Sequence, residues 1–140
     1  MIESSYFLLD DKIQNGIKDV LKWNSLTPIQ EKTIPRLLNG DNSILIAQTA
    51  GGKTEAAFLP IISEIYKEKL KPISVIYVSP IRALLNNQEF RLKKLGKIGN
   101  IDAFKWHGEV DYSNKRKFKI EPKHIIATTP ESLEAILMSE

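Results

Sequence analysis

Several features that define other protein classes are absent from this sequence of 140 residues. It contains no cysteine, which excludes disulfides and thiolate metal sites, and its two histidines leave too few ligands for a zinc cage. No apolar run approaches the roughly 18 residues of a membrane-spanning helix, and the N-terminus lacks the pattern of a secretory signal. These absences predict a soluble protein of the reducing cytoplasm with no membrane partner.

The composition fits one ordinary globular domain. The chain is 42% hydrophobic and 26% charged, and it is long enough to bury a core. Twenty basic and seventeen acidic side chains leave a formal charge of +3, with a pI near 9.0. This balance permits a polyanionic partner without identifying one.

Short apolar runs alternate with amphipathic segments, which predicts an α/β fold with a parallel sheet and helices on both faces. Two helices are expected first, the second with Thr27 as N-cap, Pro28 at its first position and Gln30 completing a capping box before a stop at Gly40. Four strand and helix pairs are then expected. The helices and pairs lie at 11–23 and 28–39, then 43–47 with 53 onward, 73–78 with 80–95, 102–106 with 112–120, and 124–128 with 131–137.

The segment 47–54 reads Ala-Gln-Thr-Ala-Gly-Gly-Lys-Thr between an expected strand and an expected helix. Glycine lets a polyphosphate approach backbone N–H groups at the positive end of a helix. Lys53 can then reach the β- and γ-phosphates, and the Thr54 hydroxyl can bind the Mg²⁺ ion that bridges them. The strict pattern Gly-x-x-x-x-Gly-Lys-Ser/Thr is not met, because Ala47 stands first. The alternative is a glycine-softened turn with a surface lysine.

This segment resembles motif I of superfamily 2 helicases of the DEAD/DEAH-box type, Ala-x-Thr-Gly-x-Gly-Lys-Thr, with Ala50 in place of the middle glycine. Its continuation at 54–60 is similar to that of the Lhr-like (large helicase-related) branch. If position 50 needs a positive φ, alanine costs about 1 kcal/mol there, and Gly51 is available to absorb the strain. The resemblance implies ATP and Mg²⁺ as cofactors, Lys53 and Thr54 as catalytic residues and Thr54 as metal ligand. The residues that it places around the nucleotide are Gln30, Thr49, Ala50, Gly51, Gly52, Lys53, Thr54 and Glu55.

Residues 26–30, Leu-Thr-Pro-Ile-Gln, resemble the Q motif of the same family, whose glutamine hydrogen-bonds the adenine edge. An amide offers the donor and the acceptor that this edge requires. A capping box alone would also explain Thr27 and Gln30, and the two roles can coexist. Where the family places a stacking aromatic, about seventeen residues earlier, we find Ile13, which leaves the strictness of adenine selectivity open.

Three later segments resemble family motifs that contact the nucleic-acid backbone. Residues 79–88 are similar to motif Ia, 106–109 to the His-Gly-Asp segment of Lhr-like proteins with Glu109 for the aspartate, and 128–133 to motif Ib. A helix start, a guanidinium and amides suit phosphate oxygens without reading sequence. Ordinary proline-initiated helices and a turn histidine would explain the same residues. The implied nucleic-acid contacts are Pro80, Arg82, Gln88, His107, Gly108, Thr128, Thr129, Pro130 and Glu131.

Two basic clusters, at 91–97 and 115–119, either extend a nucleic-acid track or form solvated helix faces, and the sequence favours the solvated faces. Every motif residue is expected to fall at the carboxyl end of a strand, where open α/β sheets bind ligands.

The resemblance spans nearly the whole chain and implies a truncated three-layer RecA-like P-loop NTPase fold with a central, mainly parallel sheet flanked by helices. We divide this partial N-terminal ATP-binding domain into Q-motif helices at 1–40 and a part from P-loop to motif Ib at 41–140. The family's Asp-Glu-x-His/Asp strand does not occur in the sequence, and the second RecA-like domain would be a further partner. We therefore expect these 140 residues to bind nucleotide weakly without hydrolysing it.

The expected function is that of the N-terminal fragment of an ATP-dependent helicase acting on DNA or RNA. A double-stranded DNA translocase of the same superfamily and a non-catalytic nucleotide- or nucleic-acid-binding module remain alternatives, because they share these motifs.

Overall fold

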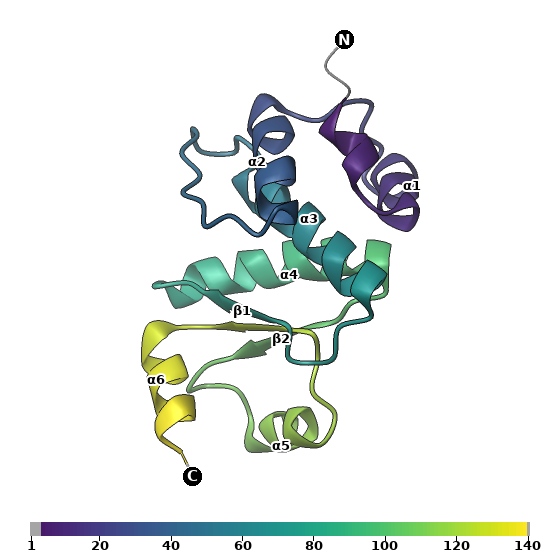
Figure 1. Cartoon of the computed structure of the whole chain (residues 1–140). Coiled ribbons are helices and arrows are strands. Elements are labelled where there is room, and N and C mark those ends of the chain that lie inside the picture. Colours follow the sequence, from purple (N-terminus) through teal and green to yellow (C-terminus); the bar gives the residue numbers. More distant parts are fainter. Residues whose placement is uncertain (1–3, 140) are drawn as a thin grey trace. The chain divides into compact units, whose positions relative to one another are not determined.

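The computed structural model describes residues 4–139, apart from the side chains at 82 and 86 (Figure 1). The chain divides into two compact units, each of which has its own core. The first unit comprises the described residues 4–70 and 98–100, and the second unit comprises 71–97 and 101–139. None of the described helices is long and apolar enough to cross a membrane.

The first unit is helical, and its helix starts are fixed by local side-chain chemistry. Asp10 caps helix α1 by accepting a hydrogen bond from the Lys12 N–H at 2.9 Å. Gln30 completes a capping box at the start of α2, where its Oε1 accepts from the Thr27 N–H at 2.9 Å. Both helices begin where the sequence predicts, although α1 ends four residues early. The elements are η1 (Ser5–Leu8), α1 (Asp11–Asp19), α2 (Pro28–Leu38) and α3 (Lys53–Glu68).

Apolar side chains and a few buried polar contacts hold these helices together. The Ser63 hydroxyl of α3 accepts from the Asp10 N–H at 2.8 Å, which joins the start of α1 to α3. The Glu31 carboxylate of α2 accepts from Ser4 Oγ at 2.6 Å and from the Ser5 N–H at 2.7 Å. Burial raises the pKa of Glu31, but these hydrogen bonds outweigh burial and lower it. The fully buried apolar side chains of the unit include Ile13, Ile17, Ile34, Leu59 and Ile62.

The second unit is built on a parallel three-stranded sheet with strand order β1-β3-β2. The central strand β3 (Ile125–Thr128) is buried at all four positions, as expected of a parallel strand with neighbours on both sides. Its partners are β1 (Val75–Val78) and β2 (Ala103–Trp106), and the following helices are α4 (Arg82–Gly99), α5 (Tyr112–Ile120) and α6 (Pro130–Met138). The last three predicted strand and helix pairs are therefore confirmed, with boundaries shifted by no more than a few residues.

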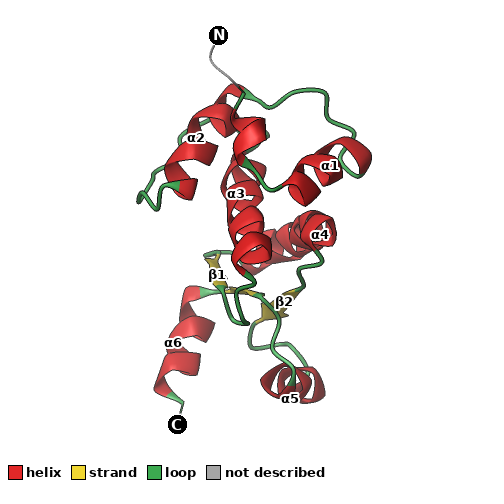
Figure 2. Ribbon diagram, turned by 45° about the vertical axis from the view of Figure 1, so that its right-hand side comes forward, coloured by secondary structure: helices red, strands yellow, loops and turns green. Residues whose placement is uncertain are grey.

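The strand predicted at 43–47 is wrong. The segment between α2 and α3 has no regular structure, and it is drawn as a loop in Figure 2. Ile44 and Ile46 are 90% and 86% exposed. An apolar run forms a buried strand only when other strands accept its backbone hydrogen bonds, and none of the described strands pairs with this segment.

Candidate functional site

The predicted phosphate loop, residues 47–54, keeps a tight turn although no strand precedes it. Ala50 has φ 61° and Gly52 has φ 82°, both in the left-handed region. The Gly51 N–H donates to the Gln48 carbonyl at 3.0 Å, and a Cβ added at Gly51 would stand 2.9 Å from that carbonyl oxygen. Gly51 therefore serves the close approach and does not take over the positive φ. The strain of about 1–2 kcal/mol remains at Ala50.

Lys53 is folded onto this loop. Its Nζ donates to the Ala47 carbonyl at 2.6 Å and to the Gln48 carbonyl at 2.8 Å. Lys53 is also the first residue of α3, so its charge lies at the positive end of that helix. Thr54 and Glu55 follow in the same first turn. The Lys53 ammonium group and the N-terminus of α3 thus both present positive charge to an anion that approaches the loop.

Gln30 lies against the end of the phosphate loop. A Cβ added at Gly52 would stand 2.9 Å from Gln30 Nε2 and 3.4 Å from Thr27 Oγ1. Gln30 is 1% exposed, so its amide is held between the start of α2 and the start of α3. Thr49 and Ala50 are exposed on the loop itself. The first unit therefore brings together the two segments that were predicted to meet the nucleotide, residues 26–30 and 47–54.

Three aromatic side chains of the first unit were not predicted from the sequence. Ile13, the residue considered for the stacking position, is completely buried in the core and presents no face to a ligand. Tyr6, Phe7 and Trp23 instead line a cavity of about 430 Å³ in the first unit, together with Glu31. The sequence does show aromatic residues before and after α1. They were not considered because the family pattern places the aromatic at a fixed spacing from the glutamine, which leads to Ile13.

In the second unit the three motif segments meet at the carboxyl edge of one sheet. Val78, Thr128 and Trp106 stand in the same register, so the residues after them leave the sheet side by side. The Ser79 N–H extends the ladder by donating to the Thr128 carbonyl at 2.9 Å. Motif Ia, motif Ib and the His-Gly-Glu segment therefore lie next to one another, as their positions after parallel strands predicted.

The exposure of the motif residues differs along this edge. Thr128 is fully buried, and Thr129 is 2% exposed because its hydroxyl caps α6 by accepting from the Ser132 N–H at 3.3 Å. His107 is 8% exposed and belongs to a turn closed by the Val110 N–H on its carbonyl at 3.1 Å. The residues that face solvent are Pro80, Gly108, Pro130 and Glu131, while Gln88 is half-buried on α4 and Arg82 begins that helix.

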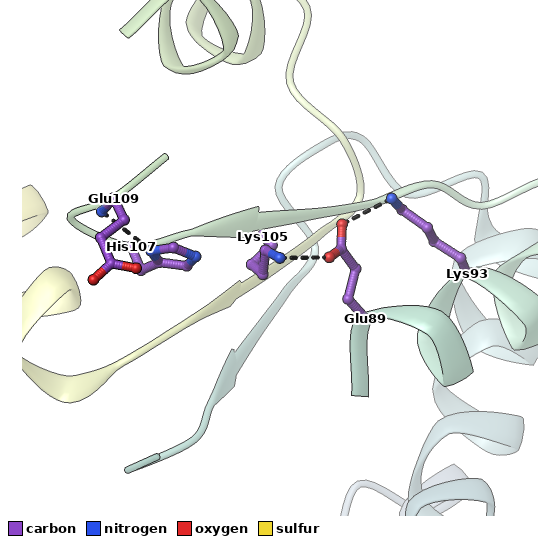
Figure 3. Close-up of polar contacts among 5 residues, drawn as sticks. All are labelled: Glu89, Lys93, Lys105, His107 and Glu109. Atoms are coloured by element: carbon purple, nitrogen blue, oxygen red, sulfur yellow. Dashed lines mark hydrogen bonds and ion pairs between the residues drawn. The ribbon is translucent and has the colours of Figure 1, made fainter. Parts of the chain in front are cut away.

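A charged cluster joins α4 to β2 beside this edge (Figure 3). The Glu89 carboxylate accepts from Lys93 Nζ at 2.7 Å and from Lys105 Nζ at 2.9 Å. Burial raises the pKa of Glu89, but the hydrogen bonds and charges of both lysines outweigh burial and lower it. The His107 Nδ1 accepts from the Glu109 N–H at 3.2 Å on the same side. These side chains line a cavity of about 400 Å³.

Comparisons with known proteins agree with the motif order. Residues 27–140 match the family described as DEAD/DEAH box helicase. The ATP-dependent helicase Lhr-Core of Methanocaldococcus jannaschii is 32% identical over 98% of this chain, which spans 18% of that protein. This chain therefore spans less than a fifth of the length of that curated relative.

Two solved structures show the same fold. The helicase Lhr of Mycobacterium smegmatis, bound to ssDNA and AMP-PNP, matches 98% of this chain and 19% of its own, with a TM-score of 0.84 and 25% identity. Mss116p, bound to ssRNA and AMP-PNP, matches 94% of this chain and 28% of its own, with a TM-score of 0.80 and 26% identity. The chain thus has the α/β fold of RecA-like helicase domains, with a parallel sheet and flanking helices.

Proposed function

Because this chain belongs to the DEAD/DEAH box helicase family, in its Lhr-like branch, we propose that it holds ATP and Mg²⁺ in the first unit and a nucleic-acid backbone in the second, as part of an ATP-dependent helicase. The contact of Gln30 with Gly52, next to Lys53 on its loop carbonyls, carries the proposal. It joins a base-recognising amide to a phosphate-binding turn within one compact unit.

The residues of the first unit fit a magnesium nucleotide. A Cβ added at Gly51 or Gly52 would stand 2.9 Å from the Gln48 carbonyl oxygen or from Gln30 Nε2, so the two glycines permit the tight turn that places backbone N–H groups at the start of α3. Lys53, whose Nζ donates to the Ala47 and Gln48 carbonyls, would hold the phosphates, and the Thr54 hydroxyl would hold the metal ion. Mg²⁺, when bound, neutralises charge on the phosphates. Gln30 has its Oε1 on the Thr27 N–H, so its Nε2 remains the atom directed at the loop.

The strand edge of the second unit suits a sugar-phosphate backbone. Pro80 and Arg82, His107 and Gly108, and Thr129 to Glu131 follow three neighbouring strands, and α4 and α6 begin at that edge. Helix starts direct N–H groups and partial positive charge at anions without reading bases. Such contacts serve DNA and RNA alike, and the relatives bound to ssDNA and ssRNA support this assignment.

Nucleotide titrations of the 140-residue chain with Lys53→Ala and Gln30→Ala test the proposal. We expect Lys53→Ala to weaken ATP binding by about tenfold or more, because a charge-assisted hydrogen bond to phosphate is lost. Gln30→Ala should reduce the preference for ATP over GTP while leaving phosphate binding in place. Lys67→Ala, an exposed lysine late in α3, is the matched control. An ATP affinity unchanged by Lys53→Ala would contradict the phosphate assignment.

We also propose that these 140 residues do not hydrolyse ATP, since the acidic motif that orients the attacking water in the family does not occur among them. A malachite-green phosphate assay with saturating ATP and Mg²⁺ should give the same rate with and without the protein. Turnover that Lys53→Ala abolishes would show that other residues supply this role.

A further inference from the structure

Helix α5 and the turn after it form a strongly basic segment. Residues 112–123 include five basic side chains and one acidic side chain, so the remaining residues contain fifteen basic and sixteen acidic ones. The segment therefore has a net charge of +4, as does the segment 91–97, which has four basic and no acidic side chains. A field concentrated in one helix attracts a polyanion far better than the same charge spread over a surface.

Aromatic packing fastens α5 to β2. Phe118, the one buried residue of the helix, stacks on Phe104 with ring centroids 4.6 Å apart, and its ring lies 5.8 Å from that of Trp106. The Lys115 Nζ sits 5.5 Å from the centre of the Trp106 ring, at cation–π distance. One side of α5 is thus fixed to β2, which ends at Trp106, and the remaining sides face solvent.

Some of these charges are already engaged within the second unit. Lys123 pairs with Asp102 at 3.5 Å and with Glu121 at 3.6 Å, and Lys115 lies over Trp106. Arg116 and Lys119 are exposed, and neither forms an ion pair within 4 Å with any residue of the described range 4–139.

Arg116, Lys119 and Tyr112 share one face of the helix. They stand at positions i+4, i+7 and i, and the Tyr112 ring is 80% exposed. Two cations beside an exposed ring combine phosphate attraction with a platform on which a base can stack. An acidic protein surface would use the cations but would leave the tyrosine ring without a function.

We propose that the α5 face, formed by Tyr112, Arg116 and Lys119, is an additional contact surface for nucleic acid. It binds the backbone independently of sequence and continues the path from the His107–Gly108 turn, which the chain leaves only three residues before α5 begins. The inference rests on the proposed nucleic-acid binding of the strand edge and extends it. Arg116 and Lys119 form no ion pair with a residue of the described range, so both charges are available to a phosphate backbone.

Fluorescence anisotropy with labelled 20-nucleotide ssDNA, ssRNA and a DNA duplex tests this surface over a series of salt concentrations. The double substitution Arg116→Ala/Lys119→Ala should weaken binding about five- to tenfold at low salt and reduce the slope of log affinity against log salt by about one to two. Lys67→Ala/Lys71→Ala removes the same charge from exposed positions elsewhere and should leave the slope unchanged. Tyr112→Ala should weaken the single strands without changing the slope.

Gly108→Asp separates this surface from the strand edge, because it adds a carboxylate at an exposed position of that edge. Loss of binding with Gly108→Asp, together with a slope in Arg116→Ala/Lys119→Ala equal to that of the lysine control, would overturn the α5 surface and leave the strand edge standing. Loss only in the α5 variant would support α5 and contradict the strand edge. A wild-type chain that binds none of the three oligonucleotides would overturn both. Far-UV circular dichroism of each variant checks that it is folded.

Discussion

Two five-residue runs that each contain two isoleucines and one alanine have different structures in this molecule. Residues 43–47 read Ser-Ile-Leu-Ile-Ala and residues 124–128 read His-Ile-Ile-Ala-Thr. The second run forms the central strand β3, whose Ile125 is completely buried between Val75 and Ala103. The first run is a loop in which Ile44 and Ile46 are almost fully exposed.

The difference lies in their neighbours. The run at 124–128 has a parallel strand on each side to accept its backbone hydrogen bonds, whereas the run at 43–47 has none among the described residues. A strand is therefore a property of a pair of segments, and an apolar run only makes pairing favourable. The turn at 48–52 forms without a strand because its φ values and hydrogen bonds are local.

The largest expected effect comes from shortening the same side chain in each run. Ile125→Ala should lower the free energy of unfolding by about 3 kcal/mol, because it leaves a cavity in the sheet core. Ile46→Ala should change it by less than about 0.5 kcal/mol, since that side chain is already in water. Urea unfolding followed by fluorescence measures both. Equal costs at the two positions would show that 43–47 is buried in solution and would remove the contrast.

Relief of strain in the phosphate loop should have an intermediate effect. Ala50→Gly removes the side chain from a left-handed residue and should raise the free energy of unfolding by about 0.5–1 kcal/mol, after allowance for the greater freedom of glycine in the unfolded chain. Ala57→Gly in the second turn of α3 is the matched control, and it should lower the stability by about 1 kcal/mol.

The measurement is urea unfolding monitored through Trp23, the tryptophan of the first unit, in a Trp106→Phe background. Opposite signs for the two alanine-to-glycine changes are the expected result. A loss of stability in both would place position 50 outside the left-handed region.

The smallest expected effect concerns Glu89, which joins α4 to β2. Its pKa is lowered in the folded state from an ordinary value of 4.5, so its stabilisation is present above that value and is lost as the pH falls through the lower folded pKa. Glu89→Gln should therefore cost about 0.5 kcal/mol at pH 7 and less near pH 3. Glu134→Gln, at an exposed site on α6, is the control and should cost little at either pH. Urea midpoints at the two pH values decide the matter, and a cost independent of pH would exclude the ion pairs as its source.

Local chemistry explains which parts of the structure the sequence predicts well. The capping box of Thr27 and Gln30 and the bounds of α5 depend on neighbouring residues, and both are confirmed. The left-handed φ of Ala50 was anticipated as a condition, but Gly51 does not relieve it.

Contacts between distant segments explain the rest. The pairing of Glu89 with Lys105 and the placement of Gln30 against Gly52 join positions that no spacing rule connects. The strand predicted at 43–47 is wrong for the same reason, because the residues of a run do not show whether another strand will pair with it. The assignments of nucleotide and nucleic-acid contacts remain predictions, which the proposed titrations test.

The shared register of Val78, Thr128 and Trp106 fixes the spacing of the segments that leave this edge of the sheet. Adjacent parallel strands are held about 4.8 Å apart by backbone hydrogen bonds. The spacing of the three motif segments therefore does not depend on their side chains. Substitutions along this edge can change which group each segment binds and how tightly it binds. The distance between the two outer segments, which follow β1 and β2, is about 10 Å because two strand spacings separate them. It should persist through changes of sequence that preserve the sheet.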